Sequence, residues 1–278
     1  MLDLRQIRRI VDVALDEDAP QGDLTGEVFV PAEAVATADL VAREEGVFAG
    51  ADVFRVAMTA IDPRVEVDLA VRDGERFAAG SRLATVHGAA RAVLRCERIA
   101  LNLVQRMCGI ATLTARYVAA AGPDVRVTDT RKTTPGLRAL ERHAVRCGGG
   151  HNHRHDLSAA VMAKDNHLAL VDDVTEAIRA ARARLPHTVH LEVEVDRLDQ
   201  IEPVLAGGVD TIMLDNFTLE DLRRGVEIVA GRALVEASGG VDLDTIGAIA
   251  RTGVDLISVG ALTHAARNLD LGLDVRVS

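Results

Sequence analysis

The hydrophobic positions of the chain follow two patterns, with a change near residue 110. At the amino end, Leu4, Ile7, Val11 and Leu15 recur at helical spacing with charged residues between them, which predicts an amphipathic helix. Residues 36–58 and 65–88 then carry short β-type runs separated by Asp-Gly and Gly-Ser turns. These features predict a small α+β domain over residues 1–110. Its DGERFAAG segment resembles the turns of carrier-type β-sandwiches, but it contains no Lys that could accept a lipoyl or biotinyl group, so we interpret it as structural.

From residue 111 onward, each apolar run is followed by a stretch with helical periodicity, such as VTEAIRAARARL and LEDLRRGVEIVAG. The apolar runs are VRVTDT, AVMAKDN, TVHLEVEVD, VDTIMLDN, ALVEASGG and DLISVGAL. Repeated strand-then-helix units predict a parallel sheet that is buried on both faces, and therefore an α/β fold for residues 111–278.

Polar or small residues stand at the end of each apolar run. They are Arg131, Lys164, Glu194, Asp215, Ser238 and Gly260. The last four are separated by 21, 23 and 22 residues, about the length of one strand-and-helix unit. Residues that could do chemistry are therefore expected at the carboxyl ends of successive strands, where an α/β barrel has its active site.

The two lysines of the chain are a second indication of a site. Of the 32 basic residues, 30 are Arg, and the only two Lys are Lys132 and Lys164. An ammonium group is a compact point donor that a planar guanidinium cannot replace in a tight pocket. We therefore predict functional roles for both, although two surface lysines remain the plainer alternative.

Glycine-rich segments follow the last two predicted strands. EASGGV and SVGALTH offer backbone N–H groups that can approach an oxyanion closely, with support from a following helix N-terminus. Two such loops in succession match the usual phosphate position in barrels of this type. A Gly pair that serves only as a turn is the alternative for each loop.

Glu194 and Asp215 are predicted to lie on neighbouring strand ends, where they could hold Mg²⁺ and sugar hydroxyls because hard cations prefer oxygen ligands. Glu192 and Glu194 share one face of a strand by alternation, so one of them could instead pair with an Arg.

The run from His151 to His155 could suggest zinc. We favour an anion pocket or a solvated loop there, because no Cys or carboxylate is placed in the sequence to complete a metal site.

Composition excludes several classes of protein. The chain has 278 residues, 48% of them hydrophobic, which suffices for a buried core. Its formal net charge is -10, with 2% aromatic residues and no Trp, which argues against nucleic-acid binding. Neither a signal peptide nor an uncharged apolar stretch of membrane-spanning length is evident. Cys96, Cys108 and Cys147 form no CxxC pair, which favours reduced thiols and a cytoplasmic location.

Positive charge is nevertheless concentrated between Asp129 and Asp156. This segment reads DTRKTTPGLRALERHAVRCGGGHNHRHD and contains six Arg or Lys residues and four His. A local cationic patch in an acidic chain predicts a small anionic ligand.

Several motifs, in order, closely resemble those of the quinolinate phosphoribosyltransferase family. They are GDLT, ERIALNLVQRMCGIAT, TRKTTPGLR, AVRCGGG, NHRHDL, KDNH, EVEV, IMLDN, EASGGV and SVGALTH, and they cover nearly the whole chain. The resemblance implies transfer of phosphoribosyl from phosphoribosyl pyrophosphate to quinolinate with loss of CO2, giving nicotinate mononucleotide for NAD synthesis. It also implies an incomplete parallel α/β barrel as the phosphoribosyltransferase domain, an open-faced α/β sandwich at the amino end, and a carboxyl-terminal tail that can return to that sandwich.

The family's site residues match positions of this chain one by one. Substrate binding is implied for Arg98, Arg131, Lys132, Thr133, His153, Arg154 and Lys164. Lys132, Lys164, Glu194 and Asp215 match catalytic positions, and the two acids match the positions that hold the ribose and Mg²⁺. Ser238, Gly239, Gly240 and Gly260 match phosphate-binding positions. His151 and His155 flank the NHR motif without an implied role.

The resemblance further implies a homodimer, or a higher oligomer, with shared active sites. Arg98 precedes the first barrel strand, so it is distant in sequence from the pocket that needs it.

Two alternatives stay open at this stage: a related pyrophosphorylase-like protein associated with molybdenum transport, which would use another acceptor, and a non-catalytic anion-binding barrel. Paired acids beside the cations argue against a simple binder.

Overall fold

The computed structural model describes residues 2–276, which form two compact units. The first unit combines the chain up to Ala115 with Thr133–Gly149 and the segment from Thr263 onward. The second unit consists of Arg116–Lys132 and Gly150–Leu262. Residue 110, where the sequence pattern changes, lies inside the long helix α4 (Ala90–Ala121).

The first unit begins with the helix that the sequence predicts. Asp3 caps α1 (Leu4–Asp18) by accepting a hydrogen bond from the backbone N–H of Arg5. Ile7, Val11 and Leu15 are buried on one face, and α1 packs against α3 (Ala51–Met58). The predicted helix is confirmed, and its burial explains the apolar spacing.

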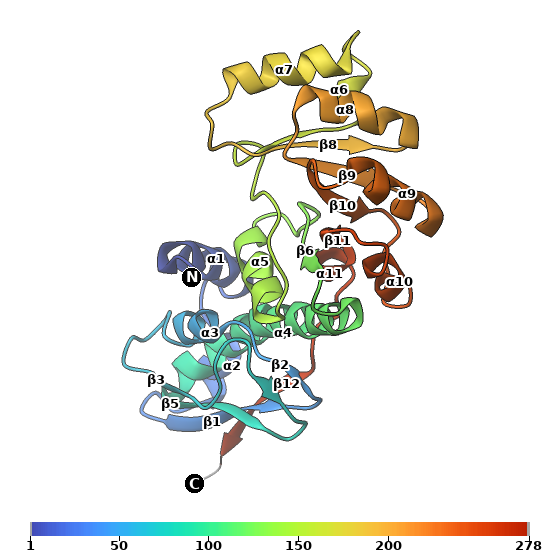
Figure 1. The fold of residues 1–278 in the computed structure, drawn as a ribbon. Helices are drawn as coiled ribbons and strands as arrows, with labels where there is room; N and C mark the ends of the chain where they lie inside the picture. Colours follow the sequence, from blue (N-terminus) through green and yellow to red (C-terminus); the bar gives the residue numbers. More distant parts are fainter. Residues whose placement is uncertain (1, 277–278) are drawn as a thin grey trace. The chain divides into compact units, whose positions relative to one another are not determined.

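A four-stranded antiparallel sheet forms the other layer of the first unit, in the order β12-β1-β5-β3. In β1, alternate residues from Ala36 to Ala42 are buried, so one face of the sheet covers the core and the other stays open. Figure 1 shows helices on one side of this sheet, which is the open-faced α/β sandwich that was expected. The remaining elements of the unit are α2 (Leu24–Phe29), β1 (Val35–Ala42), β2 (Gly46–Val47), β3 (Glu66–Leu69), β4 (Arg76–Phe77), β5 (Arg82–Ala89), α5 (Arg138–Cys147) and β12 (Leu271–Arg276).

Arg106 of α4 joins the three segments of the first unit. Its Nη2 lies 3.0 Å from Oε1 of Glu141 on α5, whose side chain is fully buried. Its Nη1 donates a hydrogen bond of 2.7 Å to the carbonyl oxygen of Ala266. A buried carboxylate needs such charged partners, so the pair fixes α5 and the carboxyl-terminal segment to α4.

The second unit contains a six-stranded parallel sheet in the order β6-β11-β10-β9-β8-β7. The strands are β6 (Arg126–Thr128), β7 (Val161–Ala163), β8 (Leu191–Val195), β9 (Thr211–Asp215), β10 (Leu234–Ser238) and β11 (Leu256–Ser258). The helices are α6 (Asp165–Leu168), α7 (Val174–Arg184), a 3-10 turn (Leu198–Gln200), α8 (Ile201–Gly207), α9 (Leu219–Val229) and α10 (Ile246–Ala250), and α11 (Ala261–His264) follows at the boundary.

Both faces of this sheet are covered, because β8 and β9 carry almost no exposed residues. Figure 1 shows α7, α8 and α9 along the outer side of the strands. The six predicted strands and the α/β fold class are confirmed. Within the described residues, the end strands β6 and β7 do not pair, so the barrel is incomplete. Consecutive strands β6 and β7 bracket the segment Thr133–Gly149, which belongs to the first unit.

In residues 2–276, no helix combines the length and the apolar character that crossing a bilayer requires.

Candidate active site

The carboxyl ends of the parallel strands surround a cavity of about 420 Å³. This size and position suit a small-molecule site in a barrel of this type. All of its lining residues belong to the second unit: Thr130, Arg131, Lys132, His153, Arg154, Met162, Lys164, Glu194, Met213, Asp215, Ser238 and Ser258. Eight of the residues predicted as site residues from the sequence are therefore brought together.

Pleating explains why these side chains share one face of the sheet. The register pairs Glu194 with Met213 and Asp215 with Ser238, and alternate residues of a strand point the same way. The same alternation directs Glu192 on β8 to this inner face, two residues deeper than Glu194.

Four cations enter the cavity, namely Arg131, Lys132, Arg154 and Lys164. Burial lowers the pKa of Arg154, and the nearby positive charge of Arg131 lowers it further. Like charges held this close repel each other, and an anionic ligand would relieve the repulsion. The cavity is therefore suited to a polyanionic ligand.

Acidic groups meet these cations on the same strand ends. The Nζ of Lys164 forms an ion pair with Oε2 of Glu194, whose side chain is 12% exposed. On the next strand, Asp215 accepts a hydrogen bond of 2.6 Å at Oδ2 from the side-chain amide of Asn216. Cations and carboxylates thus alternate across one cavity.

His153 lies above two buried carboxylates. Its Nε2 is 3.1 Å from Oε2 of Glu192 and 3.6 Å from Oε2 of Glu236, and the two glutamate side chains are 5% and 2% exposed. Burial lowers the pKa of His153, but hydrogen bonds to both glutamates outweigh it and raise the pKa to about 10. Burial also raises the pKa of Glu192. The group therefore retains a proton that an isolated His and two isolated Glu would lose near neutral pH.

The position of that proton follows from the hydrogen bonds. The Nδ1 of His153 accepts a bond of 2.7 Å from the backbone N–H of Arg154, so Nδ1 carries no proton and Nε2–H faces Glu192. The additional proton then resides on the carboxyl side of the contact, in line with the raised pKa of Glu192. The raised pKa values of His153 and Glu192 thus describe one retained proton.

Buried Asp129 orients the NHR segment. Its Oδ1 accepts the backbone N–H of His153 at 2.8 Å, and its Oδ2 accepts the side-chain amide of Asn152 at 2.6 Å. A parallel β-bridge between His151 and Thr128 of β6 also holds the start of this segment beside the sheet. Asp129, which directly follows β6, therefore fixes the position of His153 in the cavity.

The prediction for the segment from His151 to His155 is wrong in one respect. It held that no carboxylate is placed to complete a metal site, yet ligand atoms of His153, Glu192 and Glu236 lie within 4.8 Å of one another. The suggestion that Glu192 could pair with an Arg is replaced by its contact with His153. Both carboxylates arrive from strands far along the chain, which local spacing cannot reveal.

The loop after β10 requires glycine at one position. A Cβ atom on Gly239 would lie 2.2 Å from Oδ1 of Asn216, and the backbone φ there is +93°. The loop therefore lies close to the residue that follows Asp215. The expected helix does not follow directly, since α10 begins only at Ile246.

Five other residues predicted for the site do not line the cavity: Arg98, Thr133, Gly239, Gly240 and Gly260. Arg98 lies in α4 and Thr133 begins a segment of the first unit. The sequence analysis in turn missed Thr130, Met162, Met213 and Ser258 as lining residues, and Asp129, Glu192 and Glu236 as their supports. Strand alternation had already placed Glu192 on the face of Glu194, and followed inward from Ser238 it would also have found Glu236.

These observations define the chain as an α/β-barrel protein with a cation-rich cavity at the carboxyl ends of its strands. Two family models match it, the C-terminal domain of quinolinate phosphoribosyl transferase over residues 110–274 and its N-terminal domain over residues 23–108. The chain belongs to the quinolinate phosphoribosyl transferase family.

Relatives with curated names agree. A nicotinate-nucleotide pyrophosphorylase [carboxylating] of Mycobacterium leprae is 46% identical over 94% of both chains. A probable enzyme of the same name from Bacillus subtilis is 40% identical over 98% of this chain and 94% of that one. Among solved structures, NadC from Streptococcus pyogenes superposes with a TM-score of 0.95 at 42% identity, covering 99% of this chain and 98% of that chain.

Proposed function

We propose that this chain transfers phosphoribosyl from phosphoribosyl pyrophosphate to quinolinate, releasing pyrophosphate and CO2 and forming nicotinate mononucleotide for NAD synthesis. Membership of the family supports the reaction class. The observation that carries the proposal for this chain is one cavity that combines Arg131, Lys132, Arg154 and Lys164 with Glu194 and Asp215. A simple anion binder would have no use for the two acids.

The cations fit a pyridine that bears two adjacent carboxylates. Guanidinium groups bind a carboxylate through two parallel hydrogen bonds, whereas an ammonium acts as a point charge. We assign the fixed Arg contacts mainly to the carboxylate that stays, because a tight grip on the departing carboxylate would oppose its loss. We assign His153 and Arg154 to this acceptor side of the cavity, together with Arg131 and Lys132.

The transfer requires acids beside the cations. The pyridine nitrogen attacks the anomeric carbon, and the bond to pyrophosphate breaks with its electron pair on the leaving oxygen. Positive charge that develops on the ribose is stabilised by Glu194 and Asp215. With the ring nitrogen quaternary, the adjacent carboxylate leaves as CO2, and its bonding electrons remain on the ring carbon until a proton is added there.

The donor set fits Mg²⁺. This ion is typically held by one or two carboxylates together with water and substrate phosphates, and Glu194 and Asp215 offer two carboxylates in one cavity. When bound, Mg²⁺ neutralises charge on the pyrophosphate group. The ion pair with Lys164 would keep Glu194 oriented in its absence.

We assign the 5′-phosphate to the two glycine-rich loops, through Ser238, Gly239, Gly240 and Gly260. Ser238 lines the cavity, and glycine at 239 lets backbone approach closely. Backbone N–H groups at such loops are suited to phosphate oxygens.

The proposal includes a homodimer with shared sites, and a cytoplasmic location. Arg98 belongs to the unit that does not contain the cavity, so a partner subunit could supply it. On α2, Leu24, Val28 and Phe29 are 78%, 77% and 82% exposed, and a second copy would bury such apolar groups. Three free cysteines suit a reducing compartment.

The decisive experiment is a chromatographic assay for nicotinate mononucleotide. Purified protein is incubated with phosphoribosyl pyrophosphate, Mg²⁺ and quinolinate, with nicotinate as a parallel acceptor. We expect the mononucleotide and an equal amount of CO2 from quinolinate only. A Lys164→Ala preparation controls for contaminating enzymes. Absence of product, or turnover of nicotinate in place of quinolinate, would overturn the proposal.

A further inference from the structure

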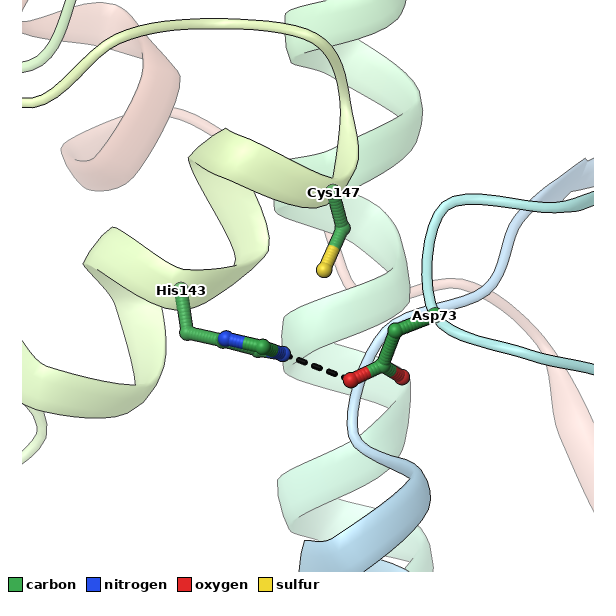
Figure 2. Close-up of side chains that lie close together, drawn as sticks. All are labelled: Asp73, His143 and Cys147. Atoms are coloured by element: carbon green, nitrogen blue, oxygen red, sulfur yellow. Dashed lines mark hydrogen bonds and ion pairs between the residues drawn. The ribbon is translucent and has the colours of Figure 1, made fainter. Parts of the chain in front are cut away.

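A second group of polar side chains lies in the first unit and takes no part in the cavity described above. It consists of Asp73, His143 and Cys147, and each offers a ligand atom within 4.8 Å of those of the other two. Figure 2 shows the sulfur of Cys147 pointing toward the hydrogen-bonded pair of His143 and Asp73.

Helix geometry places two of the three. His143 and Cys147 are four residues apart on α5, so they lie on the same face, one turn apart. The Nε2 of His143 is 2.6 Å from Oδ2 of Asp73, which lies in the turn between β3 and β4. Gly74 in this turn has a backbone φ of +89°, the left-handed conformation that favours glycine.

The carboxylate is held in place by its other oxygen. Oδ1 of Asp73 accepts the backbone N–H groups of Gly50 and Ala51, at 2.8 and 3.0 Å, where α3 begins. One oxygen is therefore fixed by the backbone while the other faces His143. Outer hydrogen bonds of this kind orient the ligands of protein metal sites.

We propose that Asp73, His143 and Cys147 bind a zinc ion. A thiolate, an imidazole and a carboxylate form a ligand set typical of zinc and unsuited to Mg²⁺. Thiolate and carboxylate together carry two negative charges, which match a divalent cation. Side-chain exposures of 22% for His143 and 27% for Asp73 leave access for water as a fourth ligand.

Binding requires little rearrangement. At usual zinc distances of about 2.0–2.2 Å and a tetrahedral angle, two ligand N and O atoms lie roughly 3.3 Å apart. The hydrogen-bonded atoms of His143 and Asp73 would therefore separate by less than about 1 Å as the metal replaces the proton between them. The ion would fasten the last turn of α5 to the β3–β4 turn.

A hydrolytic Cys-His-Asp triad fits these residues less well. Burial, together with the negative charge of Asp73, raises the pKa of the Cys147 thiol to about 12. Without a metal, the thiol is protonated and a poor nucleophile. A bound zinc ion, in contrast, deprotonates a coordinating thiol outright.

Cobalt(II) provides the test, because it occupies zinc sites and gives a near-ultraviolet charge-transfer band only when sulfur is a ligand. Full-length protein, freed of metal with a chelator, is titrated with Co²⁺ and then with Zn²⁺. We expect one equivalent of Co²⁺ to produce the band and Zn²⁺ to abolish it. The group around His153 contains no thiol, so its occupancy would not give this signal.

The variants locate the site. Cys147→Ser should remove the band, while His143→Ala and Asp73→Asn should weaken Co²⁺ binding by about tenfold or more. The Asp73→Asn variant retains a side-chain oxygen that can still accept the backbone N–H groups at the start of α3. Cys96→Ser is the matched control, since Cys96 is a buried cysteine outside the group, and it should leave the band unchanged.

Thermal unfolding provides a second test of zinc binding. Zn²⁺ should raise the Tm of the unaltered protein but not of Cys147→Ser, because only the former gains binding free energy in the folded state. Absence of the band in the unaltered protein would overturn the proposal. So would a band that persists in Cys147→Ser, or Co²⁺ binding that is unchanged in both His143→Ala and Asp73→Asn. The readout is metal binding, so it is independent of the proposed transferase activity.

Discussion

The Nε2 of His153 lies 3.1 Å from Oε2 of Glu192, and this buried contact couples the candidate active site to pH. With the pKa of His153 raised from 6.5 to about 10, the folded protein binds one proton more than the unfolded chain between these values. The stabilisation is full below about pH 6.5 and is lost as pH rises toward about 10.

We therefore predict a pH-dependent difference between the unaltered protein and Glu192→Gln. The free energy of unfolding of the unaltered protein should fall with rising pH in this window by up to about 1.4 kcal/mol per pH unit more than that of the variant. Urea unfolding at one-unit intervals of pH measures this. Glu202→Gln is the control, because Arg232 lowers the pKa of exposed Glu202 and the group is ionised throughout. Parallel curves for Glu192→Gln and the unaltered protein would contradict the shared proton.

The two lysines should be needed for turnover. Lys132→Ala and Lys164→Ala are each expected to lower kcat/KM by about 100-fold or more while the circular dichroism spectrum is unchanged, since each removes a positive group from the cavity. Lys164→Arg should recover little, because a guanidinium cannot act as a compact donor. The control Arg197→Ala removes an exposed cation that pairs with Asp196 and Asp199. Near-normal kcat/KM in either lysine variant would remove that residue from the mechanism.

The paired acids should act on the phosphoribosyl side. Asp215→Asn is expected to raise the requirement for Mg²⁺ and the KM for phosphoribosyl pyrophosphate several-fold more than the KM for quinolinate, because it removes one charge and keeps the oxygen that Asn216 bonds. Glu194→Gln should act similarly and also release Lys164. Asp196→Asn, an exposed acid close by, is the control. Equal effects on both substrates would count against the assignment.

Gly239 should tolerate no side chain. Gly239→Ala places a Cβ 2.2 Å from Oδ1 of Asn216, so the loop and Asn216 must move, and the KM for phosphoribosyl pyrophosphate should rise. Gly208→Ala is a matched control, because φ is similar at +88° but no atom lies within 4 Å. The control should cost about 1–2 kcal/mol for its left-handed backbone alone. Unfolding free energies compare the two, and equal losses with unaltered KM would show that the close approach has no effect on the site.

A shared active site should allow inactive subunits to complement each other. Arg98→Ala and Lys164→Ala, unfolded and refolded together, form mixed dimers in which one site keeps both residues and the other keeps neither. With random mixing, activity should return to at most about a quarter of that of the unaltered protein. Verified mixed dimers that stay inactive would assign Arg98 to its own subunit's site, and an active monomer would exclude sharing.

The sequence by itself determined the strands and the residues at their ends. Apolar runs followed by helical periodicity predicted β6 to β11, because strands buried on both faces must be continuously apolar. Since parallel strands present their carboxyl ends on one edge, Lys164, Glu194, Asp215 and Ser238 could be expected in one site before any contact was known. The order of motifs then indicated the family.

Only the tertiary structure decided which groups lie beneath that site and which segments share a core. Glu192 and Glu236 reach His153 from β8 and β10, and Asp73 reaches α5 from a turn far earlier in the chain. Arg106 likewise gathers α5 and the carboxyl-terminal segment into the first unit. Local periodicity indicates only which face of a segment is buried. The partners of His153, His143 and Arg106 are decided by long-range packing, because packing brings ionisable groups from distant segments into contact and so can shift their pKa values.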